Sequence, residues 1–363
     1  MTLMLASVLS RAEAEIAVER GADVIDCKDP ARGALGALPL ARIAEIVASV
    51  AGRKPVSAVV ELPHDLAHAR QAIEETAATG VAFVKFALPA TPDAADIVAD
   101  LAPLTARVKL VAVLFADLGP DFSILEPLAK AGFAGAMLDT AHKGKGRLLT
   151  YMDVGALAGF VAQCRRLGLS AGLAGGLEAP DAPRLLVMRP HVLGFRGALC
   201  AGGERAAGVD AGALSLIRDL IPRENAPGPI DADAAEKVDC VFVRDLVVPI
   251  EIGAYGFERG HTQRVRFNVD VDVASVSGPD DMRSAFSYDV VMDAIKILLA
   301  AGHFELVETL AERLAESVLL HERVRAVTVQ VEKLDVVPPG SVGVKIRRER
   351  SRGAVNAAAF AED

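Results

Sequence analysis

The fold of this chain is decided around one short stretch, Met137-Leu138-Asp139-Thr140-Ala141-His142-Lys143. The stretch ends a run of small and apolar residues, 133–138, which is typical of a buried parallel strand. An acid and a lysine follow where the strand stops, and α/β folds place their reactive side chains at that point. The chain has only 11 lysines among its 39 Lys and Arg residues, so we treat lysines at strand ends as candidate functional groups.

Short apolar runs alternate with amphipathic helical patterns on both sides of this stretch. Strands are predicted at residues 3–8, 23–27, 56–61, 82–88, 109–116, 134–138, 171–174 and 192–195. Helices are predicted at residues 11–20, 40–50, 65–78, 93–107, 125–131, 154–167, 180–187 and 211–221. Repeated right-handed crossovers close such a sheet, so the pattern predicts an α/β fold, a (β/α)₈ TIM barrel over residues 1–222. A doubly wound open sheet is the alternative, but it needs a glycine-rich fingerprint after the first strand, and residues 7–13 have none.

A second domain is predicted after a break in this pattern. Residues 223–236 contain Pro227-Gly228-Pro229 and lose all periodicity, which indicates an interdomain linker. In residues 265–273 apolar and polar side chains alternate, as in a sheet with one polar face. With a partner strand at 239–252, helices at 288–301 and 306–320, and strands at 326–332 and 342–347, the order is ββααββ. This is a small α+β domain over residues 237–350, followed by a tail at 351–363, and its open sheet edges predict a homo-oligomer.

Composition limits the classes of partner. The formal net charge is -9, and cations cluster only at 347–352, which argues against a nucleic-acid-binding surface. Residues 1–10 lack the basic start of a signal peptide, and no segment is apolar for long enough to cross a bilayer. The four cysteines are far apart and the seven histidines show no ligand grouping. We therefore expect a cytoplasmic protein that acts on small molecules without a membrane, a metal or another cofactor.

Polar residues are predicted to meet at the mouth of the barrel, because the carboxyl ends of its strands share one rim. The candidates on the second to sixth strands are Asp26, Lys28, Lys85, Asp117, Asp139 and Lys143. The seventh and eighth strands lead into segments whose small residues let backbone N–H groups approach a phosphate. The candidate residues in these segments are Gly175, Gly176, Arg196, Gly197, Ala198, Gly202 and Gly203.

Each of these residues taken alone is more often a solvated charge, a salt bridge or an ordinary loop residue. Asp26, for example, could simply pair with Arg32. Lys85 is a stronger candidate, because apolar residues flank it in a covered strand and its side chain must then point into the barrel. Neighbouring lysines lower each other's pKa, and a neutral lysine can attack a carbonyl to form an iminium while nearby aspartates move protons. The combination predicts Schiff-base aldol chemistry on a phosphorylated sugar.

The same residues carry a resemblance to a known family. The motifs are residues 21–30, residues 33–37, Phe83-Val84-Lys85, residues 137–143, Leu173-Ala174-Gly175 and Phe195-Arg196-Gly197-Ala198. Together they resemble (5-formylfuran-3-yl)methyl phosphate synthase, the enzyme of methanofuran biosynthesis that condenses two molecules of glyceraldehyde 3-phosphate. The resemblance implies that Lys28 and Lys143 are the central lysines, with Lys28 forming the Schiff base. It also implies supporting acid/base or charge-positioning roles for Asp26, Lys85, Asp117 and Asp139. The chain departs from the family pattern at Gly176, where a hydroxyl residue is expected, and in a shortened stretch before Glu126.

Two alternatives remain for the barrel. A decarboxylase of the D-x-K-x-x-D type would use Asp26 and Lys28, but residue 31 is Ala where that array needs an acid. Another Schiff-base aldolase acting on a triose phosphate is the second alternative.

Residues 237–350 resemble dihydroneopterin aldolase, which has the tunnelling fold. The motifs are residues 252–259, Ser287-Tyr288, residues 306–312, residues 331–333 and Pro338-Pro339. The resemblance implies that Glu308, beside Val307, binds the pterin edge in a pocket between subunits. It implies that Lys333 is the general acid/base and that Tyr288 and Glu258 position water and the substrate hydroxyls.

The same residues also have ordinary interpretations. Glu308 could lie on a solvated helix face, Tyr288 could be a packing residue, and Lys333 could pair with Asp335. The domain would then be a pterin-binding or oligomerisation module. We expect a bifunctional lyase for cofactor biosynthesis, with the furan phosphate made in the barrel and dihydroneopterin cleaved in the second domain.

Overall fold

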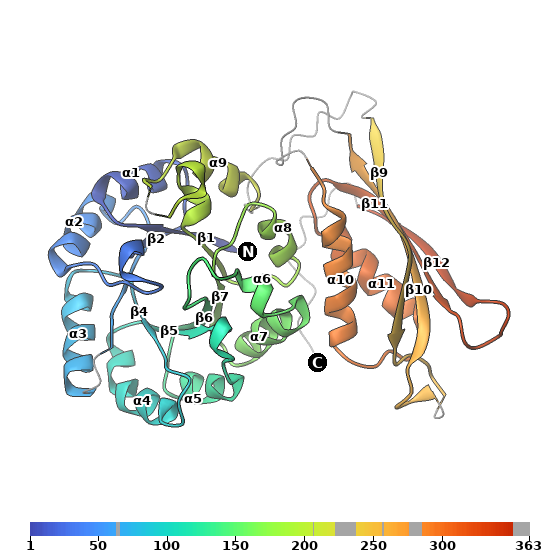
Figure 1. Cartoon of the computed structure of the whole chain (residues 1–363), viewed down its shortest axis with the longest axis horizontal. Coiled ribbons are helices and arrows are strands. Elements are labelled where there is room, and N and C mark those ends of the chain that lie inside the picture. Colours follow the sequence, from blue (N-terminus) through green and yellow to red (C-terminus); the bar gives the residue numbers. More distant parts are fainter. Residues whose placement is uncertain (63–65, 206, 222–236, 256–257, 276–284, 351–363) are drawn as a thin grey trace. The chain divides into compact units, whose positions relative to one another are not determined.

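The computed structural model describes residues 1–62, 66–205, 207–221, 237–255, 258–275 and 285–350. The predicted linker at 223–236 and the predicted tail at 351–363 lie outside these residues. The chain divides into two compact units, Met1–Ala226 and Pro227–Asp363, each of which is described by itself (Figure 1).

The first unit is a closed barrel of eight parallel strands in chain order, in which β1 pairs with both β2 and β8. Its strands are β1 (Leu3–Val8), β2 (Val24–Cys27), β3 (Val56–Val59), β4 (Phe83–Ala87), β5 (Leu110–Phe115), β6 (Gly135–Asp139), β7 (Ser170–Leu173) and β8 (Val192–Phe195). Figure 1 shows helices around the strands: α1 (Arg11–Glu19), α2 (Leu40–Val50), α3 (Leu66–Ala78), α4 (Ala94–Leu101), α5 (Leu125–Lys130), α6 (Leu148–Tyr151), α7 (Val154–Arg166), α8 (Asp181–Leu186) and α9 (Ala211–Asp219). The predicted (β/α)₈ barrel is confirmed, and among the α-helices of the described residues the short α6 was not predicted.

Local sequence explains where the barrel helices begin. The side chains of Ser10, Asp153 and Asp210 cap α1, α7 and α9 by accepting a backbone N–H bond three residues ahead. Each cap stops the chain from continuing its loop and directs it back along the outside of the barrel. Within the part of the chain that the structure describes, no helix is long and apolar enough to span a membrane.

One methionine side chain fills the barrel interior beneath the mouth. Met137 in β6 is buried and packs with Val113 and Ala174. Gly172 and Gly194, on the next two strands, make room for it, because a Cβ at these positions would lie 2.9 Å from its Cγ and 2.8 Å from its Cε. The two glycines therefore let a single large side chain form one apolar wall of the barrel cavity.

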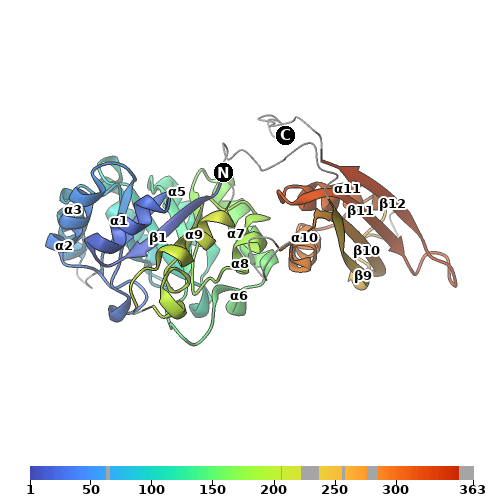
Figure 2. The same ribbon diagram turned by 90° about the horizontal axis from the view of Figure 1, so that it is seen from above.

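The second unit is a four-stranded antiparallel sheet with two helices. Its elements are β9 (Val238–Ile250), β10 (Gln263–Ala274), α10 (Tyr288–Ala300), α11 (Val307–Leu319), β11 (Val324–Lys333) and β12 (Val342–Glu349). The strand order is β12-β11-β10-β9, and Figure 2 shows both helices against one face of the sheet. Along β10, Val265, Phe267, Val269 and Val271 are fully buried while the residues between them are partly exposed, which confirms the predicted period of two. The predicted ββααββ order is also confirmed, and β9 and β12 are the edge strands of the single chain.

Candidate active sites

A cavity of about 370 Å³ lies at the carboxyl ends of the barrel strands. The predicted residues that line it are Asp26, Lys28, Lys85, Asp139, Lys143, Gly175, Gly176, Arg196, Gly197, Ala198 and Gly203. The structure therefore brings residues from the ends of β2, β4, β6, β7 and β8 into one space. Asp117 and Gly202 were predicted for the same site, but they are not among the lining residues.

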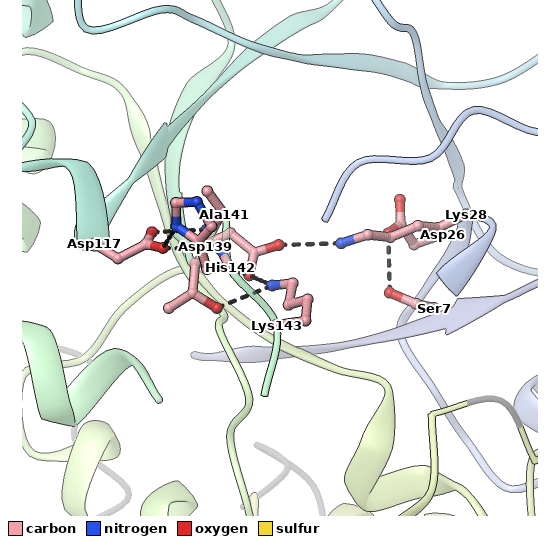
Figure 3. A network of polar contacts seen from close by, with 9 residues as sticks. Ser7, Asp26, Lys28, Asp117, Asp139, Ala141, His142 and Lys143 are labelled. Carbon is pink, nitrogen blue, oxygen red and sulfur yellow. Dashed lines mark hydrogen bonds and ion pairs between the residues drawn. The ribbon is translucent and has the colours of Figure 1, made fainter. Parts of the chain in front are cut away.

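Two lysines share one buried carboxylate in this cavity (Figure 3). Nζ of Lys28 lies 3.0 Å from Oδ2 of Asp139, and Nζ of Lys143 donates to Oδ1 of the same group. Lys143 also donates to Oγ1 of Thr140 at 3.1 Å. The side chains of Lys28 and Asp139 are only 9% and 5% exposed, so both amines are held together in a space with little water.

Burial and charge set the protonation of this group. Burial lowers the pKa of Lys143 to about 8; the nearby Lys28 charge acts in the same direction, and Asp139 opposes it. Burial alone would raise the pKa of Asp139, but the charges of Lys28 and Lys143 hold it well below its usual range. The site at neutral pH therefore contains a permanent carboxylate beside an amine that is partly neutral.

A second buried ion pair joins β2 and β4, the two strands on either side of β3. Oδ1 of Asp26 is 2.6 Å from Nζ of Lys85, and the two side chains are 1% and 5% exposed. Asp26 also accepts bonds from the hydroxyls of Ser7 at 3.1 Å and Ser57 at 2.7 Å. Arg32, the other possible partner of Asp26, instead donates to Glu61 and to the carbonyl of Ala37. Asp26 and Lys85 thus form a fixed, paired part of the cavity wall.

Asp117 supports the lysine loop from outside the cavity. Its carboxylate accepts the backbone N–H of Ala141 at 2.7 Å and of His142 at 2.8 Å, and it lies 2.9 Å from Nδ1 of His142. Burial by itself raises the pKa of Asp117, but these bonds from His142 and Ala141 bring it below its ordinary value. Asp117 was expected to be a supporting acid/base or charge-positioning group, and in the structure its carboxylate holds the backbone that leads to Lys143.

The small residues after β7 and β8 shape the remaining wall. Gly175 and Gly176 have φ of +115° and +65°, in the region that favours glycine. A Cβ on Gly175 would lie 3.0 Å from Cγ2 of Thr140, so a larger residue would press on the loop that carries Lys143. The glycines therefore bring the loop after β7 close to the lysine loop.

Arg196 differs from the expectation that it binds substrate. A guanidinium has five N–H groups, and all five are used inside the protein. They donate to Glu13 Oε2 at 2.6 Å, Glu13 Oε1 at 3.2 Å, and the carbonyls of Ser7 at 3.1 Å, Arg205 at 3.1 Å and Ala207 at 3.2 Å. Arg196 lines the cavity but has no free donor, and it ties the carbonyls of Arg205 and Ala207 to the barrel.

Sequence reasoning did not find two arginines that line the cavity, Arg147 and Arg205. Arg147 donates to Oε2 of Glu178 at 2.6 Å and to Oδ2 of Asp181 at 3.2 Å. Arg205 follows the glycine turn at 202–203, and nothing in its local sequence marks it as a site residue.

Neither a thiol nor a metal group is evident beside the lysines. Burial raises the pKa of the Cys27 thiol far above its usual range, so this residue is a packing group and not a nucleophile at neutral pH. The described residues contain no group of three or more His, Cys, Asp or Glu side chains placed to hold a metal ion.

The second unit contains a smaller polar cluster at one end of its sheet. Nζ of Lys333 lies 2.7 Å from Oε1 of Glu258, which also accepts from Nε2 of Gln263 at 3.1 Å. The bond from Lys333 lowers the pKa of Glu258 to about 2, and the backbone N–H of Tyr255 contributes to this shift. Glu258 is therefore ionised at neutral pH, and it holds Lys333 at the end of β11. Asp335, the expected partner of Lys333 if it had no special role, instead binds Arg264.

The remaining predicted residues of this unit are solvent-facing in the single chain. Tyr288 is 60% exposed, Glu308 is exposed, and Val307 is partly exposed. A backbone bond from Gly253 to the carbonyl of Phe304, 2.8 Å long, ties the segment before α11 to the loop that leads to Glu258. The start of α11 is thus held near the Lys333 cluster, and the side chain of Glu308 there is exposed among the described residues.

Comparison with protein families assigns each unit separately. Residues 4–218 match the family described as 4-HFC-P synthase. Residues 241–347 match the family described as dihydroneopterin aldolase.

Individual relatives are similar to parts of the chain. A provisionally named (5-formylfuran-3-yl)methyl phosphate synthase of Methylorubrum extorquens is 43% identical over 232 residues, which cover 61% of this chain and 94% of that protein. A (5-formylfuran-3-yl)methyl phosphate synthase of Methanococcus maripaludis is 32% identical over 219 residues, which cover 57% of this chain and 93% of that protein. Among solved structures, a dihydroneopterin aldolase of Burkholderia thailendensis bound to guanine is 34% identical and covers 31% of this chain and 93% of its own, with a TM-score of 0.29.

Proposed function

The chain belongs to the 4-HFC-P synthase family and carries a dihydroneopterin aldolase-like domain after the barrel, and from this premise we propose a bifunctional lyase of cofactor biosynthesis. In the barrel, residues 1–222, two molecules of glyceraldehyde 3-phosphate condense to (5-formylfuran-3-yl)methyl phosphate, and one phosphate and two waters leave. In the second domain, residues 237–350, 7,8-dihydroneopterin is cleaved to 6-hydroxymethyl-7,8-dihydropterin and glycolaldehyde. Residues 223–236 link the two domains.

The barrel proposal rests above all on the carboxylate of Asp139 shared by Lys28 and Lys143. The amine of Lys28 gives up a proton and adds to the aldehyde carbon of one triose phosphate, and loss of water gives an iminium. Loss of a proton from the adjacent carbon gives an enamine, whose carbon forms the new bond to the carbonyl of the second molecule. The ionised Asp139 balances the positive charge of the iminium, which is otherwise costly in a buried site.

Lys143 is the proton-transfer group of this proposal. Its pKa of about 8 lies close to neutral pH, where a group can both accept and release protons at useful rates. The same property would also allow Lys143 to be the attacking amine. Lys28 is preferred as the attacking amine because it is the residue that the family resemblance assigns.

Incubation with glyceraldehyde 3-phosphate alone tests the barrel reaction. Ultraviolet absorbance should report a furan aldehyde, and its mass should equal that of two substrates less one phosphate and two waters. Borohydride reduction during turnover, followed by peptide mass spectrometry, should place a reduced triose phosphate on Lys28. A label on Lys143 would mean that Lys143 is the attacking amine and that Lys28 is the proton-transfer group. Label without furan product would retain the Schiff base and reject the furan reaction.

The pterin proposal rests on the Lys333–Glu258 pair beside the start of α11. Lys333 transfers the proton during carbon–carbon cleavage, Glu258 and Tyr288 position water and the substrate hydroxyls, and Glu308 accepts the pterin N–H groups. The exposure of Glu308 in the single chain, together with the unpaired edges β9 and β12, supports a pocket completed by a second copy of the chain. A homo-oligomer formed through this domain is therefore part of the proposal.

The alternative is a barrel aldolase whose second domain only binds pterin or holds subunits together. Separate replacement of Lys333 by Met and of Glu308 by Gln, with light scattering as a control for assembly, discriminates the two. Loss of dihydroneopterin cleavage with an intact oligomer supports catalysis in this domain. Full turnover in both variants, with dissociation on truncation of the domain, supports the module.

A further inference from the structure

The arginines of the barrel cavity differ in whether their guanidinium groups are already bound. Among the described residues that line the cavity, these arginines are Arg147, Arg196 and Arg205. All five donors of Arg196 are used within the protein, as described above. Arg147 is bonded to two carboxylates, from Glu178 and Asp181, so its charge is already balanced. Arg205 is the cavity arginine that remains.

Arg205 has a buried donor without a partner. Its Nη2 is inaccessible to solvent and makes no hydrogen bond to the described residues. A buried charged donor left unpaired costs more than the same group in water, so a guanidinium in this state at a cavity is suited to bind an anion. The backbone of Arg205 is tied to Arg196, which donates to its carbonyl at 3.1 Å, and its Cγ lies close to Gly197.

The position of Arg205 relative to the lysines fits a phosphorylated substrate. Its charge contributes to lowering the pKa of Lys143, although burial is the main cause of that shift, so the guanidinium lies within electrostatic range of the reacting amines. Gly197, Ala198 and Gly203 line the same side of the cavity, where small residues let backbone groups approach an anion. The phosphate of a triose phosphate carries up to two negative charges and several acceptor oxygens. A guanidinium can bind two of these oxygens in a bidentate contact.

We propose that Arg205 binds the phosphate group of the triose phosphate whose carbonyl reacts with the Lys28–Lys143 pair. This assignment rests on the proposed barrel function, because it takes the substrate class from it. Arg205 is then the residue that makes the barrel select phosphorylated trioses, and Arg196 is its positioning residue.

Titration with inorganic phosphate, followed by ³¹P NMR, tests the anion site without any turnover. Loss of a charged bidentate contact is expected to weaken phosphate binding by about 10- to 100-fold in Arg205→Gln. Arg205→Lys keeps the positive charge but loses the bidentate geometry of the guanidinium. Its phosphate affinity should therefore lie between those of the wild type and Arg205→Gln. Arg107→Gln is the matched control, since it removes one exposed positive charge that pairs with Glu74 outside the cavity. Equal phosphate affinity in wild type and Arg205→Gln, or no binding by the wild type, overturns the proposal.

Borohydride trapping then separates binding from a structural effect. With glyceraldehyde 3-phosphate, Arg205→Gln should need about 10- to 100-fold more substrate for half-maximal trapping on lysine. With unphosphorylated glyceraldehyde, wild type and variant should trap at the same concentration. An equal loss with both aldehydes would mean that Arg205 acts on the lysines or the fold, and it would overturn the proposal.

The furan reaction and the phosphate site at Arg205 can be refuted independently of each other. Arg205-dependent phosphate binding in a protein that makes no furan product rejects the furan reaction and keeps the phosphate site. Furan formation with an unchanged KM in Arg205→Gln keeps the reaction and rejects the phosphate site.

Discussion

Replacement of Asp139 by asparagine is the sharpest test of the lysine pair. The change removes the negative charge that Lys28 and Lys143 share and keeps the size of the side chain. Burial and the charge of Lys28 lower the pKa of Lys143, and Asp139 is the group that opposes them, with the result that the pKa is about 8. Without Asp139, the lowering effects act alone, so the pKa of Lys143 should fall further.

The size of this fall can be estimated from the contact. An opposite charge within bonding range changes a pKa by about 1 to 3 units. Taking the pKa of Lys143 from about 8, Asp139→Asn should bring it to about 5 to 7. At pH 7 the amine would then change from about one-tenth neutral to half neutral or more. Furan formation should nevertheless slow by about 100-fold, because the iminium loses its counter-charge.

Competitive acetylation across a pH series, read by peptide mass spectrometry, measures the pKa of Lys143 directly. Lys130, whose side chain is 80% exposed on α5, is the internal control, and its labelling profile should not move. Thermal unfolding establishes that the variant is folded. A labelling midpoint for Lys143 that stays near 8 or rises in Asp139→Asn would refute the electrostatic account of this site.

Three further predictions concern the separate parts of the site. Lys28→Ala is expected to abolish furan phosphate formation and leave dihydroneopterin cleavage unchanged, since the two reactions are assigned to separate units. Loss of both activities in a folded protein would contradict that assignment. Asp26→Asn leaves the buried ammonium of Lys85 without its counter-charge, so the free energy of unfolding should fall by about 3 to 5 kcal/mol. Urea denaturation at pH 7 measures this change. A loss under about 1 kcal/mol would count against a structural ion pair. In Lys333→Met the pKa of Glu258 should rise from about 2 toward its ordinary value, because the bond from Lys333 is the main cause of the lowered pKa. An unchanged carboxylate titration in NMR would show that other contacts keep this pKa low.

The fold could be predicted almost completely because its signals are local. Each barrel strand is a short apolar run, and the alternation along β10 repeats every second residue, so both patterns can be recognised within a few positions. The lysines and aspartates at the strand ends followed from the same reasoning, since parallel strands bring their carboxyl ends to one rim. Helix α6 has four residues, too few to show a helical period.

The roles of the arginines could not be predicted, because they depend on distant partners. Arg196 and Arg205 both lie in the segment after the last strand, nine positions apart, and both follow or precede glycines. The donors of Arg196 are all used because α1 places Glu13 beside it, across a separation of 183 residues, and three backbone carbonyls take the others. Nη2 of Arg205 has no hydrogen-bond partner among the described residues, which also depends on tertiary structure. Similarly, Asp117 ends its strand like a catalytic acid, but its carboxylate is used by the loop that follows the neighbouring strand.

The Asp117 contact also determines which substitutions the lysine loop can accept. Two of its bonds are received from the main-chain N–H groups of Ala141 and His142, and the side chain of His142 is 55% exposed. Residues 141 and 142 can therefore vary widely in size and polarity while the path of the chain into Lys143 is kept. Proline alone has no N–H group to offer and would break one of the bonds. Residues 141 and 142 can thus be any residue other than proline while Lys143, which follows them, keeps its position.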